Sequence, residues 1–191
     1  LTDQVFQGIL HSPPTIEYTV KVSFMEIYME KIRDLLAPDR INLPIQEDKS
    51  KGVRVKGLSE HYMSSPDEVY DVIRRGTGVR VVSATRMNAE SSRSHTIFTF
   101  TVQQRNTETG ATKSGCLYLV DLAGSEKVDK TGASGQTLEE AKKINRSLSA
   151  LGMVINALTD GKSAHVPYRD SKLTRILHCL LYTSDAADEG L

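Results

Sequence analysis

The chain has 191 residues, of which 39% are hydrophobic and 25% are charged, a composition typical of a globular protein with its own core. No apolar stretch approaches the roughly 18 residues of a membrane span, no signal-peptide pattern stands at the N-terminus, and the net charge is zero. We therefore expect a cytoplasmic protein with neither a membrane nor a nucleic acid as its partner. Cys116 and Cys179 form no metal-ligand pattern and are expected to stay reduced.

The first elements expected are a helix and a long strand. Residues 1–10 carry apolar side chains at helical spacing, on a stripe of Val5, Phe6, Ile9 and Leu10. Two prolines then end the pattern. Residues 17–28 alternate apolar and polar side chains, which predicts a strand. Residues 46–62 contain two glycines and are expected to form short strands and a hairpin.

A second helix is expected to begin at residue 66. Ser65 suits the N-cap, Pro66 the first helical position and Glu68 the third, and apolar residues follow at helical spacing. Gly76 and Gly78 weaken this pattern. Propensity alone therefore leaves open whether the helix continues to residue 84.

Two polar loops, each beside an apolar run, carry the densest chemistry in the sequence. Residues 88–95 precede an alternating run at 95–102, and residues 121–126 follow an almost continuously apolar run at 115–120. Both runs are predicted strands, and the second is expected to be buried on both faces. A hairpin loop at residues 106–110 would join them, so the two polar loops are expected to lie near each other.

The groups in these loops suit nucleotide chemistry. Asp121 would hold Mg²⁺, directly or through water, and Gly124 would offer a backbone N–H to a terminal phosphate. The adjacent hydroxyls at residues 91–92 suit a metal ligand and a phosphate contact, while Arg93 is expected to pair with Glu126. Taken alone, each loop is weak evidence for this chemistry, because such sequences are more often ordinary polar turns.

The clearest helix prediction covers residues 137–160. Thr137 and Glu140 form a capping box, and a glycine follows the last turn. Apolar residues recur every three or four positions, at Leu138, Ala141, Ile144, Leu148, Leu151, Ile155 and Leu158. Because this helix starts downstream of the second loop, we expect loss of a phosphate there to shift it, together with Lys142 and Lys143 on its outer face.

The second half of the chain is modestly basic. Residues 127–175 contain nine Lys and Arg against five Asp and Glu, which would suit an acidic partner or simply a solvated helix face. Residues 165–175 are predicted to form a loop and then a helix with basic residues three apart. Residues 161–163 imitate the end of a phosphate-binding P-loop, but Asn156 stands where its first glycine is required.

The two loops together are more specific than either alone. Asn-x-x-Ser-Ser-Arg-Ser-His at 88–95, followed about thirty residues later by Asp-Leu-Ala-Gly-Ser-Glu at 121–126, is similar to switch I and switch II of the kinesin motor domain. The resemblance runs over residues 1–177 and is strongest to conventional kinesin heavy chains. It implies an α/β, P-loop NTPase-like kinesin motor fold with a central mixed sheet flanked by helices, and a helix that continues from residue 66 into switch I.

The resemblance also implies what is missing. Residues 1–177 are expected to be the C-terminal part of a motor domain, whose P-loop portion lies upstream and whose last strand is absent. Residues 178–191 depart from the family pattern and are expected to be a sequence artefact. Without a P-loop, the segment by itself is expected not to hydrolyse ATP.

The intact protein is expected to be a microtubule-stimulated ATPase of the cytoplasm and cytoskeleton that uses ATP and Mg²⁺. The catalytic residues implied are Ser92, Arg93 and Glu126. Those implied for the nucleotide are Asn88, Ser91, Ser92, Asp121 and Gly124, with Mg²⁺ held by Ser92 and, through water, by Asp121. Those implied for the microtubule are Lys31, Lys127, Lys142, Arg169, Lys172 and Arg175, with Asn145 as a link to the nucleotide side.

Two alternatives stay open. One is a kinesin-like module that binds microtubules without catalysis, although its switch residues would then have no chemical reason to fit together. The other is a different P-loop NTPase such as a GTPase, although an Asn-Lys-x-Asp base reader is absent from the sequence. Direction of movement and cargo are not indicated, and dimerisation through a stalk is not expected to be encoded within these residues.

Overall fold

The sheet is built around β1 (Ile16–Tyr28), a 13-residue strand that pairs along both of its sides. The computed structural model describes residues 2–48, 52–87, 93–124, 136–160 and 165–182. There the five-stranded sheet has the order β2-β1-β6-β7, with β5 also on β1, and all of these pairings are antiparallel. The other strands are β2 (Lys31–Asp34), β5 (His61–Met63), β6 (His95–Asn106) and β7 (Thr112–Asp121), while β3 (Ile45–Asp48) and β4 (Gly52–Val55) form a separate hairpin.

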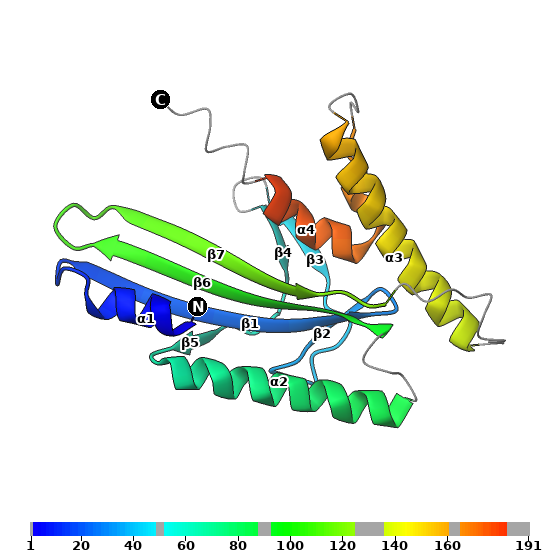
Figure 1. The fold of residues 1–191 in the computed structure, drawn as a ribbon, viewed down its shortest axis with the longest axis horizontal. Coiled ribbons are helices and arrows are strands. Elements are labelled where there is room, and N and C mark those ends of the chain that lie inside the picture. Colours follow the sequence, from blue (N-terminus) through cyan, green and yellow to red (C-terminus); the bar gives the residue numbers. More distant parts are fainter. Residues whose placement is uncertain (1, 49–51, 88–92, 125–135, 161–164, 183–191) are drawn as a thin grey trace.

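Helices lie on both sides of the sheet (Figure 1). α1 (Thr2–Leu10) and α2 (Pro66–Met87) run along one side. α3 (Gln136–Thr159) and α4 (Lys172–Tyr182) lie on the other, with the short 3-10 helix η3 (Tyr168–Asp170) just before α4. The predicted α/β class, a sheet flanked by helices, is confirmed.

Alternation along β1 and β6 divides the core into two clusters, one on each face of the sheet. On the side of α1 and α2, Phe24 packs edge to face on Phe98, with ring centroids 5.5 Å apart. On the opposite side, Ile27 and Ile97 pack with the apolar face of α4, including Leu173. Because successive side chains of a strand point to opposite faces, β1 and β6 are buried on both.

The helix predicted to begin at residue 66 is confirmed, and the question of its length is settled. Glu68 N–H donates to Ser65 Oγ at 3.3 Å, so Ser65 caps the helix, and Glu68 accepts from Ser64. α2 then continues through both of its glycines to Met87. The predicted strand at 17–28 and the helix at 137–160 are confirmed as β1 and α3, with ends shifted by one residue.

The prediction that residues 115–120 are buried on both faces is wrong. In β7, Leu117 is 37% exposed, Leu119 48% and Val120 37%. Among the described strands, β7 pairs only with β6 and stands at the end of the sheet. A continuous apolar run therefore identified the strand but not its surroundings.

Two predicted apolar stripes are only partly buried. Leu10 is 76% exposed, although Phe6 of the same stripe is buried. On α3, Ile155 and Leu158 are 48% and 41% exposed, because the buried side of this helix is the one that faces α4 and η3. That side carries Ile144, Ser147, Ala150 and Val154.

The two glycines of α2 have opposite surroundings, which gives a matched test of the packing. A Cβ added at Gly76 would lie 2.3 and 2.7 Å from two ring carbons of Phe24, whereas one added at Gly78 meets nothing within 4 Å. In the whole motor domain, Gly76→Ala is expected to lower the free energy of unfolding by about 1–3 kcal/mol through overpacking.

Gly78→Ala serves as the control for this substitution. It is expected to raise the free energy of unfolding by about 0.5–1 kcal/mol, because alanine has a higher helix propensity than glycine at an exposed position inside a helix. Urea unfolding of both variants measures the difference. Equal effects of the two substitutions would contradict the close contact between α2 and Phe24.

Candidate functional site

The two polar loops are brought together by the register of β6 and β7. Thr96 pairs with Asp121, so the first residues of β6 lie beside the last residue of β7 at one end of the sheet. Residues 93–95 and 121–124 are therefore neighbours, as the predicted hairpin requires. This end of the sheet is the candidate site.

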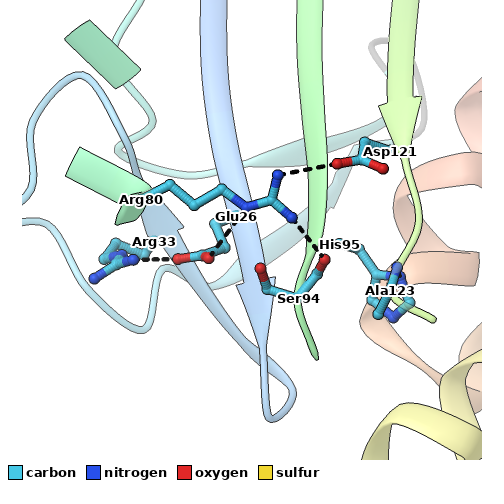
Figure 2. Close-up of polar contacts among 7 residues, drawn as sticks. All are labelled: Glu26, Arg33, Arg80, Ser94, His95, Asp121 and Ala123. Atoms are coloured by element: carbon cyan, nitrogen blue, oxygen red, sulfur yellow. Dashed lines mark hydrogen bonds and ion pairs between the residues drawn. The ribbon is translucent and has the colours of Figure 1, made fainter. Parts of the chain in front are cut away.

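Arg80 of α2 holds this end of the sheet together (Figure 2). Its Nη1 lies 2.9 Å from Oδ2 of Asp121, and its Nη2 donates to the backbone oxygen of Ser94 at 3.3 Å. Its Nε lies 4.0 Å from Oε1 of Glu26, which also forms an ion pair with Arg33. The guanidinium thus links α2 with the ends of β1, β6 and β7.

Sequence reasoning missed Arg80 and Glu26. The Glu26 side chain is only 7% exposed, and it stands in β1 between apolar neighbours that fill the core. A carboxylate in that position requires a cationic partner, because an unpaired buried charge is costly. That signal was present in the sequence, but it does not indicate which arginine supplies the charge.

His95 forms a second connection at the same end of the sheet. Its Nδ1 accepts from the backbone N–H of Ala123 at 3.0 Å, and its Nε2 lies 2.8 Å from Oγ of Ser147 on α3. Ser147 Oγ in turn donates to the backbone oxygen of Ile144 at 2.7 Å. Burial lowers the pKa of His95 to about 4, against the smaller opposing effect of the Asp121 carboxylate.

The predicted nucleotide residues are placed in part. Arg93 is half-buried beside His95, the Asp121 side chain is 66% exposed and Gly124 is exposed. Five of the predicted site residues lie outside the described residues: Asn88, Ser91, Ser92, Glu126 and Lys127. The expected pairing of Arg93 with Glu126 therefore stays a prediction.

Three of the predicted microtubule residues gather around η3 and α4. Arg169 and Arg175 both bind the carboxylate of Glu47, at 2.9 and 2.8 Å. The hydrogen bond from Arg175, assisted by Arg169, holds the pKa of Glu47 below its usual value. Lys172 opens α4, and its backbone N–H donates to Oε2 of Glu30 at 2.9 Å.

The remaining predicted basic contacts lie on separate elements. Lys31 is exposed at the start of β2, directly after Glu30. Lys142 is exposed on α3, where its Nζ lies 3.2 Å from Oε1 of Glu139. Asn145 is half-buried on the same helix.

The turn between β1 and β2 has an uncommon backbone. Met29 and Glu30 have φ of 49° and 60°, the left-handed region that favours glycine or asparagine. Glu30 accepts the Lys172 N–H at the start of α4, where a carboxylate is favoured by the helix dipole. This contact fastens the turn to the helix that carries the basic residues.

The described residues contain neither a membrane-spanning helix nor a cluster of metal ligands. Among their helices, none combines the length and the apolar character that crossing a membrane requires. Within the same residues, no group of three or more His, Cys, Asp or Glu is placed to hold a metal ion.

Comparison with known proteins identifies the class of this fold and site. The family model of the kinesin motor domain matches residues 1–186. The kinesin heavy chain of Syncephalastrum racemosum is 73% identical over 177 residues, which cover 93% of this chain and 19% of that protein. The chain belongs to the kinesin motor domain family.

Solved structures agree with this assignment. A fast kinesin superposes with a TM-score of 0.86 at 72% identity, over 93% of this chain and 50% of that one. A KIF14 dimer, solved with AMP-PNP in complex with a microtubule, superposes with a TM-score of 0.81 at 36% identity, over 93% and 53% of the two chains. The chain thus spans about half of these solved chains and about a fifth of its curated relatives.

The lowered pKa of His95 makes stability depend on pH. Between about pH 6.5 and pH 4 the unfolded chain binds a proton at His95 that the folded chain does not, so folding stability falls as the pH falls. Each unit of pH in this window is expected to cost up to about 1.4 kcal/mol, with no contribution above the window. The Asp121 carboxylate acts on the charge of the ring, and Arg93, Lys143 and Glu30 line the cavity beside it.

Chemical denaturation of the whole motor domain between pH 4 and 8 measures this dependence. The variant His95→Asn, which cannot titrate in that window, is the control and is expected to show a shallower slope. Identical slopes for the two proteins would show that the proton uptake occurs elsewhere.

Proposed function

We propose that this chain is the switch-bearing and track-binding part of a microtubule-stimulated ATPase that moves along microtubules. The observation that carries the proposal is the junction of residues 93–95 with 121–124 at one end of the sheet, tied to α3 through Ser147. Such a junction suits a nucleotide-dependent change that is passed to a helix. Kinship with motors solved for their ATPase mechanism or in complex with a microtubule supports it.

In the whole protein, the nucleotide would be ATP with Mg²⁺. Asp121 is an exposed carboxylate at a strand end, a donor that suits Mg²⁺ or its water shell. Ser92 would be the direct metal ligand, with Asn88, Ser91 and Gly124 on the nucleotide. When bound, Mg²⁺ neutralises the charge that develops on the phosphates. Arg80 pairs with Asp121 here, so metal binding at Asp121 would compete with that ion pair.

Arg93 and Glu126 would close the two switches on each other and orient the attacking water. Phosphoryl transfer needs positioning and charge stabilisation more than covalent chemistry, which a paired arginine and carboxylate can supply. Ser92 would complete the catalytic set.

The track-binding face would combine α4 and η3 with neighbouring elements. Arg169, Lys172 and Arg175 lie on these helices, and Lys31 follows the turn that Glu30 fastens to α4. Lys142 on α3 and Lys127 would extend the face toward the second switch. Acidic residues of tubulin would be its partners, and the protein would work on microtubules in the cytoplasm.

The segment by itself would not be a motor. Its sequence contains no Gly-x-x-x-x-Gly-Lys-Ser/Thr motif, whose backbone and lysine hold the phosphates in P-loop enzymes. We assign residues 1–177 to the C-terminal part of a motor domain and propose that the tail at 178–191 is foreign to it, although the family model extends to residue 186. Microtubule-stimulated ATP turnover by the purified segment would contradict this assignment.

Glu126 provides the test of catalysis. In the whole motor domain, Glu126→Ala is expected to lower microtubule-stimulated turnover about 100-fold or more, because the water loses its orienting pair. Nucleotide affinity should stay unchanged. The control is Glu108→Ala, in the loop between β6 and β7. Turnover that survives the Glu126 substitution would remove this residue from the mechanism.

Glu47 provides the test of the track-binding face. Glu47→Gln releases Arg169 and Arg175 from their shared carboxylate and removes a negative charge beside them. Exposed ion pairs contribute little, so microtubule affinity is expected to rise by about fivefold at most. Cosedimentation at low and high salt measures it, and the gain should shrink as salt screens the charges.

Glu60→Gln is the matched control for this test. Glu60 pairs with Lys21 on a different part of the sheet, and its loss should leave microtubule affinity unchanged. An equal gain from both substitutions would mean that only net charge matters. No gain from Glu47→Gln would place the two arginines away from the track.

A further inference from the structure

The hydrogen bonds around His95 have only one consistent direction. Ala123 N–H donates to Nδ1, so that nitrogen holds a lone pair and the neutral ring carries its proton on Nε2. Nε2–H then donates to Ser147 Oγ, whose own O–H donates to the Ile144 carbonyl oxygen. These hydrogen bonds form a continuous series from Ala123 through His95 to α3.

These bonds join three elements that are distant in the sequence. His95 opens β6, Ala123 follows β7, and Ser147 lies on α3. All three residues are buried, with exposures of 3%, 5% and 2%. Since α3 packs chiefly against α4 and η3, the ring gives it a direct polar tie to the end of the sheet.

The position of the ring is set by its bonds rather than by close packing on every side. A cavity of about 10 Å³ adjoins it, lined by Arg93, Ser147 and Ile144 among others. Both nitrogens of a buried histidine need partners, and here those partners lie on different elements, so the ring bridges them. The aromatic ring also keeps its two nitrogens at a fixed separation, so a displacement at Nδ1 reappears at Nε2.

We propose that His95 is a positioning residue that couples the segment 121–124 to α3. The proposal rests on the proposed function, in which Gly124 responds to the terminal phosphate. Movement of that backbone carries Ala123 N–H with it, and the rigid ring passes the movement to Ser147. His95 itself touches neither nucleotide nor track.

The test uses the whole motor domain and removes either the Ala123–His95 or the His95–Ser147 hydrogen bond. His95→Asn keeps an acceptor where Nδ1 stood but cannot reach Ser147. Ser147→Ala removes the same bond from the other side. His95→Gln reaches Ser147 but leaves Ala123 without its acceptor. Each variant is expected to reduce the stimulation of ATP turnover by microtubules about fivefold or more, a larger loss than that of basal turnover.

The double variant and a conservative variant separate coupling from simple damage. The double variant, His95→Asn with Ser147→Ala, should lose no more stimulation than either single variant, because the two substitutions remove the same hydrogen bond. Ser147→Thr keeps the hydroxyl, has the adjacent cavity for its methyl group, and should retain stimulation. Thermal unfolding of each variant verifies that it is folded.

Three results would overturn the coupling role. They are unchanged stimulation in the single variants, equal losses of basal and stimulated turnover, or a double variant whose loss is the product of the single losses. Failure of the proposed function is seen separately, because the unsubstituted motor domain would then show no stimulation at all.

Discussion

The pairing of β6 with β7 is the constraint on which the candidate site depends. Its register places Thr96 opposite Asp121, so the start of one strand and the end of the other cannot lie apart. Antiparallel strands joined by a short loop return the chain to where it began. Two loops about thirty residues apart in sequence thus form one site. A shift of either strand would change the position of one loop relative to the other.

Buried charge fixes the same end of the sheet in a second way. Glu26, Arg80 and Asp121 come from β1, α2 and β7, and Glu26 is almost fully buried. A buried carboxylate is tolerated only where its partners are in place, so these elements must assemble together. The Asp121 carboxylate, which we propose for Mg²⁺, is already paired with Arg80. Binding of Mg²⁺ there would therefore replace the guanidinium by the metal ion.

The sequence predicted local structure well and surroundings poorly. The cap at Ser65 and the alternation in β1 depend on neighbouring residues, so pattern alone located α2 and the strand. The exposure of Leu119 in β7 and of Ile155 in α3 depends on what packs against them, which periodicity does not contain. The switch motifs, His95 included, were identified by resemblance, whereas Arg80 and the hydrogen bonds of His95 emerged only once three elements met in space.

The carboxyl end of β1 connects the two candidate surfaces. Glu26 faces Arg80 at the proposed nucleotide site, and Glu30, four residues on, holds the first N–H of α4 at the proposed track-binding face. Between them Ile27 and Met29 line the cavity beside His95. The positive φ of Met29 and Glu30 makes this turn costly to form, and both the pairing of β1 with β2 and the contact of Glu30 with α4 stabilise it. β1 would therefore resist a displacement of α4, while α3 meets the sheet through the His95–Ser147 hydrogen bond and the packing of Leu151.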